Sequence, residues 1–444
     1  MHVYIEKSEK YDKKLVDRVI TSWEKVLSKN IYPGDVVVLK PNWISESHIH
    51  KKDEWEHVVT HPLIIESVLE LVLKILRGKG KIIITDGPET CASWNKLMEI
   101  MNPAKWINMG RKAGVDVSVM DLRDDEWVKK GEMIVQRKKL QGDPLGSVIC
   151  NLAEKSEFVG KNAGKYGFFG ADYNQKETNE AHSLGNHFYK VSRSVLEADV
   201  FINLPKLKAH KKAGITCSLK NLVGINTYKN WLPHHTCGTP SEEGDQFPEK
   251  SFRSLSEGSC TRVIYDYLAT RPQAAKYFIP IRKIGKFVFG DTDNTIRSGS
   301  WHGNDTLWRM VLDLNKILFY ANVNGELRKD FPGNKKRYFS IVDAVVSGEG
   351  NGPLAPEKKN TGLIVLGSDP VSVDAACAKL MGFSWEKIPV IKNAFAIQSY
   401  PFSPDNYEDI HIKSSIEEFN KPLTRISKNF SFKPPLGWKD YIEL

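Results

Sequence analysis

The sequence predicts an α/β fold in which helices flank a mostly parallel, Rossmann-like sheet. Short β-branched runs such as residues 35–40 alternate along the chain with amphipathic helical segments such as residues 62–76. A strand, a helix and a second strand in this order form a right-handed unit whose strands are parallel. The continuous apolar character of the strands is typical of a sheet that is covered on both faces.

In the first part of the chain, the predicted helices carry apolar side chains at helical spacing and the predicted strands are short apolar runs. Pro62 begins one helix at a position that the first helical turn tolerates, and Gly78 ends it. The predicted helices span residues 13–28, 62–76 and 94–101, and the predicted strands span residues 35–40, 81–85 and 115–122.

The rest of the chain continues this alternation after a stretch, residues 124–170, that predicts short strands or an inserted loop layer. A strand at residues 200–204 stops at Pro205, because proline cannot donate to the ladder. We therefore expect a single large α/β domain over residues 1–444, with insertions near residues 124–190 and 227–300. Further predicted helices span residues 192–196, parts of 254–287, 305–320 and 370–382, and further predicted strands span residues 339–346 and 363–366.

The composition restricts the class of protein. A hydrophobic content of 41% and a charged content of 26% are typical of a soluble globular chain. No apolar run approaches the ~20 residues of a membrane span, and the first residues are too polar for a secretory signal. We therefore expect a cytoplasmic protein without a membrane partner. The six cysteines contain no CxxC pair, which argues against a cysteine-held metal or a disulfide framework.

The stretch DVFINLPKLKAHKKAGITCSLKNLVGIN, residues 199–226, is the most distinctive part of the sequence. Lysines and a histidine follow the strand and alternate with apolar residues, which a solvated loop seldom does. Lysine is a flexible point charge that suits phosphate or carboxylate, so the stretch predicts an anion-binding site. The alternative is a basic surface turn that leads into a core helix or strand. The net charge of +9 likewise favours acidic small molecules, and nucleic acid only as a weaker interpretation.

Polar residues also follow the carboxyl ends of four predicted strands. In an open parallel sheet these ends lie on one edge, where such folds bind ligands. Polar residues also mark where any strand leaves the core, and for Asp369 the capping of a helix is a sufficient explanation. The residues at the strand ends are Lys40 with Asn42, Asp86, Lys206 with Lys208, and Asp369.

These positions give a set of candidate site residues. We predict that Lys206, Lys208 and Asp86 are catalytic. Carboxylates such as Asp374 suit a hard cation or proton transfer, although Asp374 could instead stabilise the first turn of its own helix. The predicted substrate-binding residues are Lys40, Asn42, His210, Lys220 and Asn221, and the predicted ligands of a divalent metal ion are Glu349, Asp343, His182 and His187.

Five ordered blocks of the sequence resemble the domain-of-unknown-function 362 family. They are KPNW at residues 40–43, THP at residues 60–62, NLPKLKAHKKAGITCSLKNLVGIN from Asn203, GEGNGPLAP from Gly348 and GSDPVSVDAACAKLMG from Gly367. The resemblance runs from about residue 35 to residue 382 and implies no settled activity. Some relatives carry ferredoxin-type cysteine clusters, which this chain lacks, so we expect no iron-sulfur cluster. The first half is also loosely similar to the N-terminal domain of nickel-pincer lactate racemases, an analogy of fold that does not transfer function.

Two functional hypotheses follow. In the first, the protein is an enzyme that binds a carboxylate or phosphate small molecule at the carboxyl edge of the sheet, with acidic residues for a metal ion or proton transfer. In the second, the same lysines belong to a non-catalytic binder of an anionic ligand or polymer. We do not expect nucleic acid as the partner, and the sequence leaves a homo-oligomer open.

Overall fold

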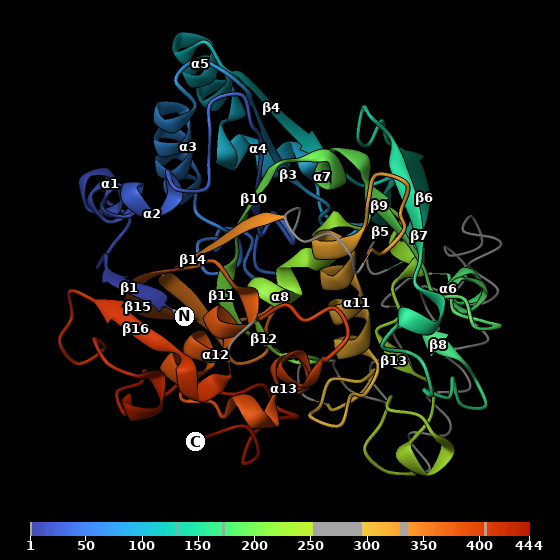
Figure 1. Cartoon of the computed structure of the whole chain (residues 1–444). Coiled ribbons are helices and arrows are strands. Elements are labelled where there is room, and N and C mark those ends of the chain that lie inside the picture. Colours follow the sequence, from blue (N-terminus) through green and yellow to red (C-terminus); the bar gives the residue numbers. More distant parts are fainter. Residues whose placement is uncertain (1, 131–132, 171–173, 252–294, 329–335, 404–405) are drawn as a thin grey trace.

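The computed structural model describes residues 2–130, 133–170, 174–251, 295–328, 336–403 and 406–444. Within these residues the chain folds as a mixed α/β protein with a large, mostly parallel central sheet, which confirms the predicted class (Figure 1). The helical segments predicted within residues 254–287 lie outside the described residues. No helix in the described part of the chain is long and apolar enough to cross a membrane.

Ten strands of the described chain form the central sheet, in the order β16-β1-β15-β14-β10-β2-β3-β4, with β11 added beside β14 and β12 beside β11. The run from β14 through β10, β2 and β3 to β4 is parallel throughout, whereas β15 is antiparallel to both of its neighbours. The strands are β1 (His2–Lys7), β2 (Val36–Pro41), β3 (Lys81–Asp86), β4 (Asp116–Asp121), β10 (Val200–Leu204), β11 (Lys206–His210), β12 (Gly214–Thr216), β14 (Arg337–Glu349), β15 (Glu357–Gly367) and β16 (His411–Ser414).

Helices cover both faces of this sheet, as the apolar strands require. Successive strand residues alternate between two cores: Leu39 packs with the first group of helices, and Val38 packs with the second. The first group is α1 (Lys13–Ser22), α3 (Pro62–Leu76), α4 (Trp94–Met101) and α5 (Pro103–Ala113), and the second includes α8 (Ser218–Asn221), α11 (Leu307–Tyr320), α12 (Pro370–Met381) and α13 (Pro389–Ala396).

Small strand pairs lie beside the main sheet, most of them within the stretch between β4 and β10 and one completed by β13 after it. They form three two-stranded ladders, β5 with β6, β7 with β9 and β8 with β13, in the described part of the chain. These elements are β5 (Asp125–Lys130), β6 (Met133–Lys139), β7 (Ser147–Asn151), β8 (Phe168–Phe169), α6 (Gln175–Ala181), β9 (Phe188–Ser192), α7 (Arg193–Glu197) and β13 (His235–Thr236).

The basic stretch after Pro205 is a buried strand, not the turn that the sequence suggested. Strand β14 is 13 residues long, and β10 pairs only with its first part, residues 337–340. The backbone therefore continues past Pro205 as β11, which pairs with the second part of β14 from Asp343 to Gly348. All five residues of β11 are buried, and the turn proper is confined to residues 211–213 before β12.

The first helix also differs from the prediction. The segment expected as one helix is α1 followed by the short α2 (Glu24–Leu27), with the break at Trp23. The N–H of Trp23 donates to the Ile20 carbonyl oxygen, a tightened contact that ends α1. The other helices and strands predicted within the described residues are present, several with shifted ends.

Candidate functional site

The first pair of predicted residues to meet is Lys40 and Asp86, at the ends of the adjacent parallel strands β2 and β3. The Lys40 Nζ lies 2.7 Å from the Asp86 Oδ1, and both side chains are buried. Asp86 also accepts the backbone N–H groups of Trp43 (2.7 Å) and Gly87 (2.8 Å). Burial lowers the pKa of Lys40, and the carboxylate of Asp86 opposes that change. Asp86 is thus held as the buried counter-ion of Lys40.

The second pair is Lys206 and Asp343, on the paired strands β11 and β14. Their side chains are fully buried, with the Lys206 Nζ 2.5 Å from the Asp343 Oδ2. The Tyr11 hydroxyl accepts from Lys206 (2.6 Å) and donates to the Asp343 Oδ1 (2.8 Å). Burial, followed by the charge of Asp343, raises the pKa of Tyr11 well above its ordinary value. The charge of Lys206 is therefore compensated within this group of three by the carboxylate of Asp343.

A chain of hydrogen bonds connects three more of the predicted residues, Lys208, Asn42 and Asn221. The Lys208 Nζ donates to the Asn42 Oδ1 (2.8 Å) and to the Val58 carbonyl oxygen (2.5 Å). The Asn42 amide donates to the Asn221 Oδ1, and the Asn221 amide donates to the Asn203 Oδ1, each at 2.7 Å. The ends of β2, β10, β11 and α8 therefore meet at one edge of the sheet, as the sequence predicted. The prediction is wrong for Asp369, because β15 is antiparallel to its neighbours and its carboxyl end points toward the other edge.

Lysines and histidines gather at this edge in excess of carboxylates. The charge of Lys40 lowers the pKa of Lys220. The charges of Lys212, Lys220 and Lys229 lower the pKa of His234. The carboxylate of Asp86 opposes the lowering of the pKa at Lys40, Lys208, Lys220 and Lys229, and Asp121 adds a smaller opposing charge at Lys229. We call this group the cationic cluster, and its members are Lys40, Lys208, Lys212, Lys220, Lys229, His210 and His234.

Burial lowers the pKa of the lysines in the cationic cluster. It is the main reason that the pKa of Lys220 is about 8, and the nearby charge of Lys40 lowers it further. Burial also lowers the pKa of Lys229 to about 7, against the attraction of Asp86. The Lys229 Nζ donates to the carbonyl oxygen of Asn226 at 2.9 Å. Both amines thus exchange protons near neutral pH.

His210, a predicted substrate-binding residue, holds the turn after β11. Its Nδ1 accepts the backbone N–H groups of Lys212 (3.0 Å) and Ala213 (3.1 Å), so the ring carries its proton on Nε2. Burial, followed by the charge of Lys220, lowers the pKa of His210 well below its ordinary value. The ring is therefore neutral.

The four predicted metal ligands lie in three separate local networks, because only His182 and His187 are in contact with each other. Asp343 belongs to the group with Lys206 described above. Glu349 accepts the N–H of Lys433 (3.0 Å) and pairs with Lys359 (3.1 Å). Among the described residues, no three His, Cys, Asp or Glu side chains lie together in an arrangement that could hold a metal ion. The binding of a divalent metal stays a prediction.

The other two predicted ligands, His182 and His187, face each other with their Nδ1 atoms 3.2 Å apart. The His182 Nε2 lies 2.9 Å from the Trp231 carbonyl oxygen and must donate to it. The His182 Nδ1 therefore accepts a hydrogen bond from the Nδ1–H of His187, and both rings are neutral. Burial lowers the pKa of His182 to about 3 and that of His187 to about 4.

This histidine pair makes stability depend on pH. Unfolded histidines take up protons as the pH falls below ~6.5, whereas the folded pair does so only near its lowered pKa values. The stabilisation is therefore complete above pH ~6.5 and is lost toward pH ~4, by up to ~1.4 kcal/mol per pH unit for each ring. We expect His187→Asn to reduce the fall in the free energy of urea unfolding between pH ~7 and pH ~5. The control is the exposed His411 on β16, changed to Asn; an equal pH slope in the wild type and His187→Asn would contradict this account.

Two aspartates that could have belonged to the site have structural partners. Asp374 accepts the N–H groups of Ser218 (2.6 Å) and Leu219 (3.1 Å) and thereby holds the start of α8. Burial raises the pKa of Asp374 to about 7. Asp369 caps α12 through the N–H of Val371 (2.9 Å), as the capping interpretation predicted.

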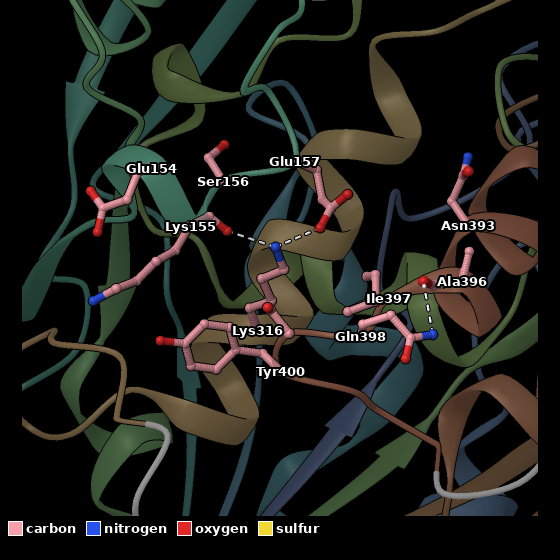
Figure 2. A pocket seen from close by; sticks show the side chains of 11 residues that line it. Glu154, Lys155, Ser156, Glu157, Lys316, Asn393, Ala396, Ile397, Gln398 and Tyr400 are labelled. Carbon is pink, nitrogen blue, oxygen red and sulfur yellow. Dashed lines mark hydrogen bonds and ion pairs between the residues drawn. The ribbon is translucent and has the colours of Figure 1, made fainter.

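A cavity of about 510 Å³ lies apart from the cationic cluster and contains none of the predicted site residues (Figure 2). Figure 2 shows Lys316 pointing toward Glu157 and toward the backbone of Lys155. The Lys316 Nζ lies 2.5 Å from the Glu157 Oε1 and 2.6 Å from the Lys155 carbonyl oxygen. Glu157 thus neutralises one of the two lysines that line this cavity, and Glu154 lines it as well.

The predicted site residues lacked five residues of the site, namely Tyr11, Asn203, Lys212, Lys229 and His234. Asn203 precedes the end of β10 and faces Asn221, and its polar side chain within an apolar strand was the available signal. Lys229 lies three residues after the end of the family block that begins at Asn203, and this closeness in sequence was the available signal. Tyr11 had no local signal, because its partners are on β11 and β14.

Comparison with solved structures gives two distant likenesses. A protein from Thermotoga maritima is 10% identical with a TM-score of 0.35, and covers 80% of this chain and 55% of its own. The lactate racemase apoprotein from Thermoanaerobacterium thermosaccharolyticum is 10% identical with a TM-score of 0.33, and covers 85% of this chain and 57% of its own. This chain thus spans little more than half the length of either protein. No curated protein matches the sequence.

Comparison with protein families gives a match that spans most of the chain. The model of the family described as domain of unknown function (DUF362) matches residues 37–145 and 154–379. These ranges include the ends of β2, β3, β10 and β11, and therefore the cationic cluster. The protein belongs to the DUF362 family.

Proposed function

We propose that this protein is an enzyme that binds an acidic small molecule, a carboxylate or a phosphate, at the cationic cluster. The proposed site lies beside the carboxyl ends of the parallel strands, where a Rossmann-like sheet binds its ligands. The observation that supports the proposal is the gathering of four lysines, Lys40, Lys208, Lys220 and Lys229, near the carboxylate of Asp86 in the described structure. A second carboxylate, Asp121, acts on Lys229.

Electrostatics explain why an anion would bind there. Removing an ammonium group from water is unfavourable unless a counter-charge compensates for it. Lys206 has that compensation in Asp343. Among the described residues, the hydrogen-bond partners of Lys208 are neutral oxygens only, and its pKa is lowered well below the ordinary value. A bound anion would supply the missing negative charge and would raise the pKa of the surrounding lysines.

The lowered pKa values support a catalytic role for this site. An amine that titrates near neutral pH can both give and take a proton, which suits general acid-base catalysis. Lys220 and Lys229 have this property, with pKa values of about 8 and about 7. The catalytic roles of Lys206, Lys208 and Asp86 stay part of the proposal, and loss of turnover in their alanine variants would support them.

We expect inorganic phosphate and succinate to bind by isothermal titration, with affinity that falls as the pH rises from ~7 to ~9. The cause is the loss of protons from Lys220 and Lys229 over this range. Each proton that must be taken up on binding lowers the affinity by up to about tenfold per pH unit. Titration in two buffers of different ionisation enthalpy should show proton uptake on binding at pH ~8.

The test variant is Lys220→Ala, which removes a charge from the site. The matched control is Lys176→Ala, which removes an exposed charge. Binding should weaken at least tenfold in the first variant, the equivalent of about 1.4 kcal/mol, and should not change in the second. Absence of binding by any small anion would overturn the proposal. Binding of heparin without binding of either small anion would instead favour the binder of polymeric anions, and addition of magnesium or nickel to the titration tests the predicted metal.

A further inference from the structure

Lys220 differs from the other lysines around it. Lys40, Lys206, Lys208 and Lys229 all donate to oxygen atoms of the protein. Within the described part of the chain, the Lys220 amine has no hydrogen-bond or ion-pair partner. Its side chain is partly buried, and the charges of Lys40 and Asp86 both act on its amine. An unpartnered amine in this position is available for a ligand.

The backbone that carries Lys220 is fixed on both sides. On one side, Asp374 accepts the N–H groups of Ser218 and Leu219. On the other side, the Asn221 side chain is hydrogen-bonded to Asn42 and Asn203. Lys220 therefore extends from a rigid support, while its own amine stays unengaged. That combination is typical of a reactive group and would be unusual for a solvated surface lysine.

We propose that Lys220 forms a Schiff base with the carbonyl group of an anionic aldehyde or ketone, such as a 2-oxo acid. This inference rests on the proposed function, because the other lysines of the cationic cluster would hold the anionic group of the same molecule. It assigns the substrate class and gives Lys220 the role of nucleophile.

The reaction is balanced without an oxidant or a reductant. The neutral amine attacks the carbonyl carbon and forms a C–N bond, and the carbonyl oxygen takes up a proton to give a carbinolamine. Loss of that oxygen as water breaks the C–O bond and leaves a protonated imine. Burial and a neighbouring cation are the two features that activate lysines for this chemistry. With a pKa of about 8, Lys220 has roughly a hundredfold more neutral amine at pH ~8 than an ordinary lysine.

The test uses pyridoxal 5′-phosphate, which combines an aldehyde with a phosphate, on the full chain at pH ~8. Borohydride would reduce the imine to a stable secondary amine, and peptide mass spectrometry would locate it. With probe limited to one equivalent, we expect Lys220 to carry at least about tenfold more label than the exposed Lys176, because its neutral fraction is roughly a hundredfold larger. Inorganic phosphate should suppress the labelling of Lys220 and leave that of Lys176 unchanged.

Two controls separate this inference from the proposed function. Lys220→Arg keeps the charge and cannot form an imine, so it should bind phosphate and lose the label. Pyridoxine 5′-phosphate has the same phosphate without the aldehyde, and it measures anion binding alone. Binding of pyridoxine 5′-phosphate without label at Lys220 would overturn the Schiff base and leave the proposed function intact. Failure of both phosphates to bind would overturn the proposed function and the inference with it.

Discussion

Replacing Lys206 by methionine should lower the free energy of unfolding by about 3–5 kcal/mol, because it leaves the charge of Asp343 buried without its partner. Both side chains are fully buried, so water cannot take the place of the ammonium group. The Tyr11 hydroxyl still donates to Asp343 in the variant, but a neutral donor compensates a carboxylate only in part. Urea unfolding at neutral pH measures the loss.

The double variant Lys206→Met with Asp343→Leu tests the cause. It removes both charges and fills the space with apolar atoms, which is often close to neutral for a buried pair. We expect it to be more stable than either single variant. The exposed pair Lys428 and Glu418 is the control, where loss of the lysine should cost less than about 1 kcal/mol. A cost in Lys206→Met as small as in this control would contradict a buried ion pair.

Local sequence signals predicted much of the fold. Strand β2 and helix α3 could be found because apolar periodicity and proline placement act over a few residues. Strand β1 was missed, since its identity depends on pairing with β15 near the other end of the sequence. Strand β11 was missed for a similar reason: five alternating basic and apolar residues become a buried strand only because the long β14 offers a partner.

The candidate site was predictable in its location but not in its pairing. Parallel strands place their carboxyl ends on one edge, so the approach of Lys40 to Asp86 follows from topology. The pairing of Lys206 with Asp343 joins residues 137 positions apart, and nothing local distinguishes a lysine with a buried partner from one that faces a ligand. Lys220 and Lys206 look alike in the sequence, but only Lys206 has a carboxylate partner in the described structure.

The narrow space around Gly224 leads to the second large effect that we expect. Gly224 lies in a 3-10 turn, Leu222–Ile225, and its carbonyl oxygen accepts the N–H of Gly87 at 2.9 Å. A Cβ added at Gly224 would lie 1.8 Å from the Asp86 Oδ1 and 2.7 Å from the Lys40 Nζ. Both distances are too short for real contacts, so alanine would force the ion pair apart or displace the turn. Glycine is required here by close approach, not by its backbone angles.

We therefore expect Gly224→Ala to destabilise the protein by about 3 kcal/mol or more, from overpacking and from the broken pair together. Phosphate binding should weaken at the same time, because Lys40 belongs to the cationic cluster. The control is Gly146→Ala, where the added methyl group meets nothing within 4 Å but the backbone is left-handed, so that strain alone should cost about 1 kcal/mol.

A double-mutant cycle tests whether the loss of stability in Gly224→Ala depends on Asp86. If the methyl group acts by displacing the carboxylate, then Gly224→Ala should cost much less in a chain that already carries Asp86→Ala, because the clashing oxygen is absent. Urea unfolding of the four chains gives the coupling energy, which we expect to be about 1–3 kcal/mol. Additive effects of the two substitutions would show that Gly224 serves the turn alone. In that case the close contact between this turn and the ion pair would have no role in positioning Lys40 and Asp86.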